Sequence, residues 1–194
     1  MGNGYIMKPL DKSTLSPVLL LIISIGICLL AGVIGSFFTT AGIPVWYAGL
    51  IKPALTPPAW VFAPVWTTLY VLMGIALFLI LRSGGKKEDV TICLVLFAAQ
   101  LVLNVMWSVI FFGLHSIFFG LACLALLFII VLCTTVMTLR VSRNAGLLLI
   151  PYLLWLCIAG YLNASIYLLN PCDPVPLSDV SGRGSDQYLL FLGK

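Results

Sequence analysis

The chain contains very little charge. Only 8% of its 194 residues are Asp, Glu, Lys or Arg, whereas 62% are hydrophobic, and the mean hydropathy is +1.18. A soluble domain of this size cannot bury so much apolar surface, because its surface is too large for its volume. The net charge of +4 is also too small and too dispersed for nucleic-acid binding. The composition therefore predicts a protein solvated by lipid, with no nucleic-acid partner.

Residues typical of metal and nucleophilic sites are also scarce. There is one histidine, His115, and none of the six cysteines forms a C-x-x-C pair. His115 could act as an axial haem ligand, but no second ligand accompanies it. No Ser, Cys or Asp nucleophile has a base to activate it. We expect no metal site and no required cofactor, and we interpret the cysteines as small hydrophobic residues.

Long apolar runs dominate what remains. Five of them reach the roughly 20 residues that a helix needs to cross a bilayer, and none contains Asp, Glu, Lys, Arg or His. They cover approximately residues 16–38, 61–81, 90–112, 117–139 and 145–169. Because backbone groups find no water in lipid, each run should be an α-helix. We predict an all-α, integral membrane bundle of five helices over residues 1–170, without the intramembrane charges that proton pumps and voltage sensors use.

The basic residues predict the orientation. Seven of the ten lie on the side shared by the N-terminus and the connections 82–89 and 140–144. By the positive-inside rule, the N-terminus faces the cytoplasm, while loop 39–60 and the tail face out. The tail, 171–194, is polar and is expected to be disordered. The short chain without a transit peptide favours a prokaryotic cell membrane, with the mitochondrial outer membrane as the alternative.

Loop 39–60 is long and contains four prolines. Proline fixes φ and cannot extend a helix, so we expect this loop to be stiff. Long ordered loops often act as lids or binding elements. The five tryptophans add to this picture: Trp46 and Trp60, in or beside the loop, fit an aromatic belt at the membrane interface. Trp155 does not, because it lies about 15 Å deep in the fifth run at 1.5 Å per residue.

Polar and aromatic side chains recur at helical spacing within three of the runs. Each set lies on one helical face. The sets are Trp66, Tyr70 and Met73/Gly74; Gln100, Asn104, Trp107, Ser108 and Phe111; and Trp155, Ala159 and Asn163. The first run has a different pattern, with Ser24, Cys28, Gly32 and Ser36 at every fourth position. We interpret this small-residue seam as a helix-packing surface.

The three faces reach a similar depth. Trp66, Asn104 and Asn163 lie about 8–12 Å from the ends of their runs nearest the long loop, from the helical rise. This convergence predicts an apolar cavity with tryptophan walls and two amides beneath a lid. The alternative is structural: amides in membrane helices also bond neighbouring helices, and aromatic stripes also pack.

Three blocks of the sequence resemble the TspO/MBR family of tryptophan-rich sensory proteins and translocator proteins, also called peripheral-type benzodiazepine receptors. The first block runs from Trp46-Tyr-Ala-Gly-Leu through Lys52-Pro53, Pro57-Pro58-Ala-Trp60 and Pro64-Val-Trp66 to Met73-Gly74. The second is Gln100-Leu-Val-Leu-Asn104 with Trp107 and Phe111-Phe112-Gly113. The third is Pro151-Tyr152-Leu-Leu-Trp155 with Leu162-Asn163. The likeness covers about residues 16–170.

The resemblance implies a five-helix bundle that binds porphyrins such as protoporphyrin IX and haem-type tetrapyrroles, sterol-like lipids and benzodiazepine-site ligands. The implied ligand-binding positions are Trp46, Trp66, Tyr70, Asn104, Trp107, Trp155, Ala159 and Asn163. It favours a receptor or stress sensor. It leaves open an enzyme in which Trp66 and Trp155 support light- and oxygen-dependent porphyrin breakdown, and a sterol or lipophile transporter, for which no inverted repeat or coupling-ion site is visible.

Two positions depart from the family pattern. The vertebrate sterol-recognition segment carries Tyr and Arg where this chain has Ala164 and Leu168, which argues against sterol binding by that route. A Gly-x-x-x-Gly seam of some members corresponds to Val95 and Ala99 here. A homodimer is one assembly that the resemblance allows, but this substitution weakens the expected interface.

Overall fold

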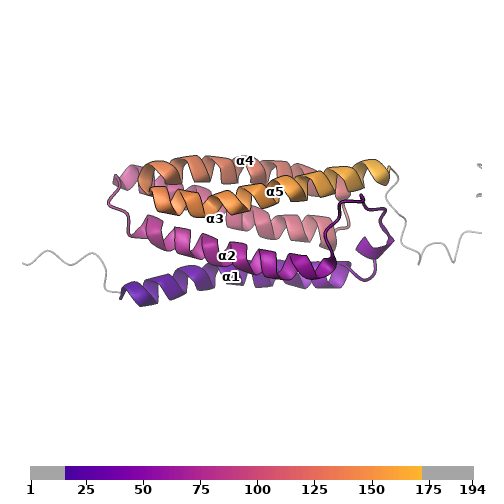
Figure 1. Cartoon of the computed structure of the whole chain (residues 1–194), viewed down its shortest axis with the longest axis horizontal. Helices are drawn as coiled ribbons and strands as arrows, with labels where there is room; N and C mark the ends of the chain where they lie inside the picture. Colours follow the sequence, from indigo (N-terminus) through magenta and orange to yellow (C-terminus); the bar gives the residue numbers. More distant parts are fainter. Residues whose placement is uncertain (1–15, 172–194) are drawn as a thin grey trace, which may run out of the picture.

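The computed structural model describes residues 16–171 and is all-helical there (Figure 1). Its five long helices are α1 (Pro17–Gly42), α2 (Ala59–Leu81), α3 (Lys87–Ser108), α4 (Ile117–Val141) and α5 (Arg143–Leu169). A short 3₁₀ helix, η1 (Tyr47–Gly49), lies between α1 and α2, and a π-helical turn, η2 (Val109–Gly113), follows α3. Within residues 16–171, five helices are long and apolar enough to cross a membrane. The predicted five-helix, multi-pass membrane fold is confirmed.

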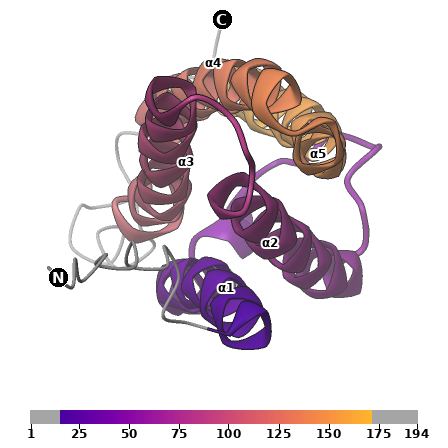
Figure 2. The same ribbon diagram turned by 90° about the vertical axis from the view of Figure 1, so that its left-hand side faces the viewer.

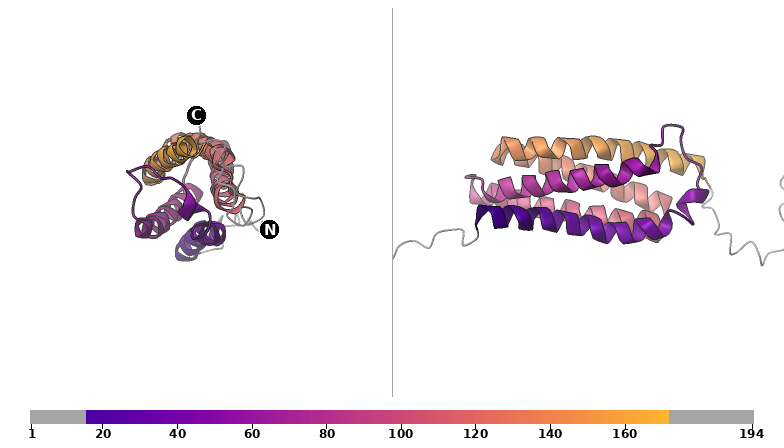
Figure 3. Two further views of the ribbon diagram at one scale, coloured as in Figure 1. Left: turned by 90° about the vertical axis from the view of Figure 1, so that its right-hand side faces the viewer. Right: turned by 60° about the horizontal axis from the view of Figure 1, so that its bottom comes forward.

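The helices form a ring when the bundle is viewed along its axis. Figure 2 shows α1 beside α2, α2 beside α5, α5 beside α4, and α4 beside α3, which returns to α1. One end of the bundle carries residues 43–58 and the last turn of α5, and we call it the loop end (Figures 1 and 3). The other end carries the start of α1, the connection 82–86 and Ser142, and we call it the basic end.

The helix limits differ from the predicted runs at three places. Helix α1 continues to Gly42, so the long loop is 43–58 rather than 39–60, and Pro44 follows the capping residue Ile43. Helix α3 begins at Lys87, which places Glu88 and Asp89 in its first turn, where the helix dipole favours acidic groups. Only Ser142 separates α4 from α5. The predicted disordered tail lies, from residue 172 onward, outside the described residues.

Serine caps set the start of two helices. The Ser16 side-chain oxygen accepts a hydrogen bond from the Leu19 N–H at 3.2 Å, and Pro17 occupies the first helical position. The Ser142 oxygen accepts from the Ala145 N–H at 3.5 Å. A serine cap satisfies a backbone donor that the helix leaves free, and proline suits the first turn because its missing N–H is not needed there.

Candidate functional site: a cavity between four helices and the long loop

A cavity of about 640 Å³ lies inside the loop-end half of the bundle. Its walls come from α1, α2, α3 with η2, and α5, and residues of the loop 43–58 complete it. Seven of the eight ligand positions implied by the sequence line it: Trp66, Tyr70, Asn104, Trp107, Trp155, Ala159 and Asn163. The three polar and aromatic stripes thus meet at one shared chamber, although Met73, Gly74 and Gln100, farther from the loop, do not line it.

Asn104 joins two tyrosines beside the cavity. The Tyr70 hydroxyl donates to Asn104 Oδ1 at 2.6 Å, and Asn104 Nδ2 donates to the Tyr152 hydroxyl at 2.7 Å. All three side chains are buried. The network links α2, α3 and α5, and it satisfies polar groups that would otherwise be costly away from water. Asn104 therefore has a structural role, because it connects three helices by hydrogen bonds. This is the structural alternative that the sequence allowed for the amides.

Helix α1 supplies one wall of the cavity, which the sequence reasoning missed. Gly32 and Ser36 line the chamber, whereas Ser24 and Cys28 are buried between helices. The packing interpretation therefore holds for Ser24, Cys28 and Gly32, although Gly32 and Ser36 also border the chamber. A Cβ at Gly32 would collide with the Tyr70 ring. The absent side chain at Gly32 thus lets Tyr70 reach Asn104.

Aromatic rings form a large part of the remaining walls. The Trp66 ring stacks on Tyr70 with centroids 5.7 Å apart and meets the Trp155 ring edge-on at 6.4 Å. Across the chamber, Trp107 stacks on Phe111 at 5.4 Å. Such offset and edge-on pairs hold rings in fixed orientations. The cavity thus presents flat apolar surfaces from three different helices.

The π-helical turn η2 explains how two consecutive phenylalanines are both buried. Phe111 is 2% exposed and Phe112 is 8% exposed, and both line the cavity. A π turn adds a residue to the helical repeat, so the stripe that began at Gln100 widens at its end. Helical spacing placed Phe111 on the stripe but gave no sign of Phe112.

The eighth implied position, Trp46, does not line the cavity. It is 7% exposed and lies behind the chamber wall, edge-on to Phe111 at 5.3 Å and stacked on His115 at 4.9 Å. Trp60, by contrast, is 74% exposed. The interfacial-belt interpretation therefore fits Trp60 but not Trp46, which anchors the loop against η2.

Several polar atoms near the cavity have no hydrogen-bond partner among the described residues. These are the indole nitrogens of Trp107 and Trp155 and both amide atoms of Asn163 and of Gln100. Each of these groups is buried, and buried polar groups are normally paired. Trp107, Trp155 and Asn163 also line the chamber. These indole and amide atoms are themselves inaccessible, so they lie within the walls and not on the surface of the chamber.

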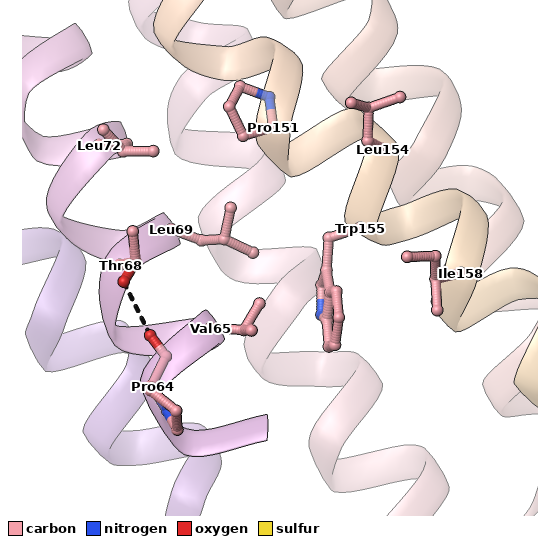
Figure 4. Close-up of a pocket in the computed structure, with 9 residues that line it drawn as sticks. All are labelled: Pro64, Val65, Thr68, Leu69, Leu72, Pro151, Leu154, Trp155 and Ile158. Carbon is pink, nitrogen blue, oxygen red and sulfur yellow. Dashed lines mark hydrogen bonds between the residues drawn. The ribbon is translucent and has the colours of Figure 1, made fainter. Parts of the chain in front are cut away.

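A second hollow lies between α2 and α5 and shares one residue with the cavity. It has a volume of about 430 Å³ and is lined mostly by aliphatic side chains and by Pro64 and Pro151. Figure 4 shows Trp155 extending from α5 into this space, opposite Val65 of α2. The one hydroxyl lining it, that of Thr68, already donates to the Pro64 carbonyl at 2.9 Å. Trp155 lines both hollows and therefore forms part of the partition between them.

The long loop is held against the end of α5. The Asn170 amide accepts from the Ile51 N–H and donates to the Ile51 carbonyl, each at 3.0 Å. Figure 3 shows the loop passing beside the end of α5 on its way from α1 to α2. Tyr47 and Lys52 of this loop line the cavity. Burial raises the pKa of the Tyr47 hydroxyl still further above physiological pH.

Comparison with known proteins gives one consistent family. The sequence profile of the TspO/MBR family matches residues 24–169. The chain is 47% identical over 154 residues to the tryptophan-rich protein TspO of Chlorobaculum tepidum, covering 79% of this chain and 98% of the relative. It is 42% identical over 126 residues to the translocator protein of Sus scrofa, covering 64% and 75%. It is 35% identical over 125 residues to the tryptophan-rich sensory protein of Cereibacter sphaeroides, covering 64% and 77%. The fold, the tryptophan-walled cavity and these matches show that the chain belongs to the TspO/MBR family.

Proposed function

We propose that the protein is a membrane receptor or sensor that binds porphyrins of the protoporphyrin IX and haem type, and other flat lipophiles, in the cavity. The observation that carries the proposal is the set of aromatic rings from α2, α3 and α5 around one chamber of about 640 Å³. This size lies within the roughly 300–1,000 Å³ of ordinary ligand pockets. Flat walls favour a flat ligand, because stacked rings gain the most contact area.

The chemistry of the walls supports a lipophilic ligand. Among the described residues that line the chamber, Lys52 is the one that carries a full charge, and it lies in the loop. The deeper walls offer mostly apolar surface, because the indole N–H groups of Trp107 and Trp155 are inaccessible within them. A porphyrin would fit this pattern, because its faces are apolar and its polar substituents lie at its edge.

We also propose that the basic end faces the cytoplasm of a prokaryotic cell. This end contains five of the described cations: Arg82, Lys86, Lys87, Arg140 and Arg143. An excess of Lys and Arg marks the cytoplasmic side of membrane proteins. The cavity would then open towards the outer side, beneath the loop.

A titration tests the binding proposal. Protoporphyrin IX added to the purified protein in non-ionic detergent should quench tryptophan emission and saturate at about one porphyrin per chain, because one cavity holds one macrocycle. Free tryptophan at matched concentration in the same micelles is the control. Quenching that follows this control without saturating would contradict the proposal.

A second candidate function is porphyrin breakdown driven by light and oxygen. The observation that favours it is the close approach of Trp66 and Trp155, whose rings lie 6.4 Å apart and line the same chamber. An indole is an electron-rich ring that can be oxidised beside a bound macrocycle. Illumination in air should then convert bound protoporphyrin IX to a new absorbing product. Trp155→Phe should reduce its rate at saturating porphyrin at least tenfold, whereas bleaching at the protein-free rate would exclude this activity.

A further inference from the structure

The walls of the cavity differ in how far their side chains are exposed. On α3, η2 and α5, every residue that lines it is buried or half-buried. The exposed lining residues of the long helices all belong to α1 and α2, and they are Val33, Ser36, Thr40, Ala59, Ala63 and Thr67. A residue that borders an internal chamber and is also exposed marks a place where the wall is open. The chamber therefore opens sideways between α1 and α2, and we call the opening between these six residues the slot.

Close packing of α1 against α2 ends where the slot begins. A Cβ at Gly74 would collide with the Ile25 backbone, and one at Gly32 would collide with the Tyr70 ring. Glycines at these positions let the two helices approach closely. Figure 2 shows α1 and α2 crossing at an angle, so they separate again on the way to the loop end. The slot lies in this diverging part.

The rim of the slot suits contact with lipid. Ser36 of α1 and Ala63 of α2 lie at a similar level, about 6–9 Å from the loop-end limits of their helices at 1.5 Å per residue. The Ser36 hydroxyl donates to the Val33 carbonyl at 2.7 Å, and the Thr67 hydroxyl donates to the Ala63 carbonyl at 2.9 Å. Hydroxyls that are bonded within their own helix do not need water. The slot therefore opens into the hydrocarbon of the leaflet nearest the loop.

The end of the chamber nearest the water is covered instead. Residues of the loop 43–58 complete the cavity there, and the loop is attached at two points (Figure 3). Asn170 bonds the backbone of Ile51 in both directions at 3.0 Å, and the Trp46 ring packs edge-on against Phe111 at 5.3 Å. A ligand that entered beneath the loop would have to break these contacts. A ligand that passed through the slot would break neither.

We propose that the ligand enters and leaves the chamber sideways, from the bilayer leaflet at the loop end, through the slot between α1 and α2. This inference rests on the proposed porphyrin pocket and adds the route by which that pocket is filled. The chamber exchanges its ligand with the bilayer, in which a flat lipophile is already dissolved. The small side chains at the rim set the rate of exchange, and the loop is a fixed cover.

Rapid mixing of the protein in lipid vesicles with protoporphyrin IX tests the route. Tryptophan quenching gives the association rate, and a chase with excess empty vesicles gives the dissociation rate. The double variant Ser36→Leu, Ala63→Leu places two branched side chains at the slot. It should slow both rates at least tenfold, because one passage serves both directions. Damage to the bound state would instead speed dissociation.

Two control variants separate the slot from general bulk and from the loop. Ala122→Leu with Ala125→Leu adds the same kind of side chain at exposed positions of α4, which does not line the chamber. Asn170→Ala removes the hydrogen bonds that attach the loop to α5 at Ile51. Both controls should exchange porphyrin at the wild-type rates.

Three results would overturn the inference. The first is exchange at wild-type rates, or faster release alone, in the Ser36→Leu, Ala63→Leu variant. The second is equal slowing in the α4 control. The third is a tenfold rise of both rates in Asn170→Ala, because the loop would then be the route. In each case saturable binding by the wild type would leave the proposed pocket intact. If the wild-type protein bound no porphyrin saturably, the proposed function itself would fail, and the inference with it.

Discussion

Asn104→Leu is expected to lower the free energy of unfolding by about 2–6 kcal/mol, because it leaves two buried tyrosine hydroxyls without partners and each costs about 1–3 kcal/mol. The Tyr70 hydroxyl would lose its acceptor at 2.6 Å, and the Tyr152 hydroxyl would lose its donor at 2.7 Å. Leucine has the same branching as asparagine and is not smaller, so lost hydrogen bonding and not a void dominates the change. Thermal unfolding in a fixed detergent measures the difference.

Gln100→Leu is the matched control, one helical turn away on α3. Gln100 is also fully buried, but neither of its amide atoms has a hydrogen-bond partner among the described residues. Removing a buried polar group that makes no hydrogen bond should be neutral or stabilising. Equal losses of stability in the two variants would show that the network at Asn104 has no special role.

Ala159→Phe is expected to weaken protoporphyrin IX binding tenfold to a hundredfold while the protein remains folded. Ala159 lines the chamber on α5, between Trp155 and Asn163. A phenyl ring there would occupy space that the macrocycle needs, and overpacking of this kind costs about 1–3 kcal/mol. The chamber of about 640 Å³ has room for a phenyl ring, so thermal stability should change little. Saturation of tryptophan quenching gives the affinity.

Leu168→Phe is the control for this substitution, because it adds a ring on the same helix where the side chain is 75% exposed. It should bind protoporphyrin IX like the wild type. If Ala159→Phe kept full affinity, the macrocycle would bind elsewhere, for example in the hollow between α2 and α5. If both variants lost affinity equally, the effect would come from general disturbance of α5.

The features of this structure that could be predicted from the sequence are those that a lipid environment imposes on the backbone. Backbone groups in a bilayer must bond within a helix, so apolar length alone located the five spans. Helical spacing then placed Trp66, Asn104 and Trp155 on inward faces, and these residues do line one cavity. Tyr152 was detectable by the same logic, because it lies three residues before Trp155 and faces the same side.

The α1 wall could not be predicted from its own residues. A seam of small residues looks the same whether it packs against a helix or borders a cavity. At Gly32 the difference depends on Tyr70, which lies against it from α2. The two buried phenylalanines of η2 were hidden for a related reason: a π turn changes the repeat, and the apolar run around it gives no local sign of that change.

The contacts that the loop makes could not be predicted from the sequence either. The pairing of Asn170 with Ile51 joins segments 119 residues apart that have no periodic relation. Proline content indicated a stiff loop, but not which side chains it would bring to the chamber. Trp46 illustrates the limit, because its place near the helix end suggested an interfacial residue, whereas tertiary packing on Phe111 and His115 buries it.

The position of a bound macrocycle tests the account most directly. A crystal structure with zinc protoporphyrin would locate the metal by its anomalous signal. We predict zinc inside the cavity, beside Ala159 and between the α2 and α3 walls. Zinc in the hollow lined by Pro64 and Pro151, or on the lipid-facing surface, would contradict it.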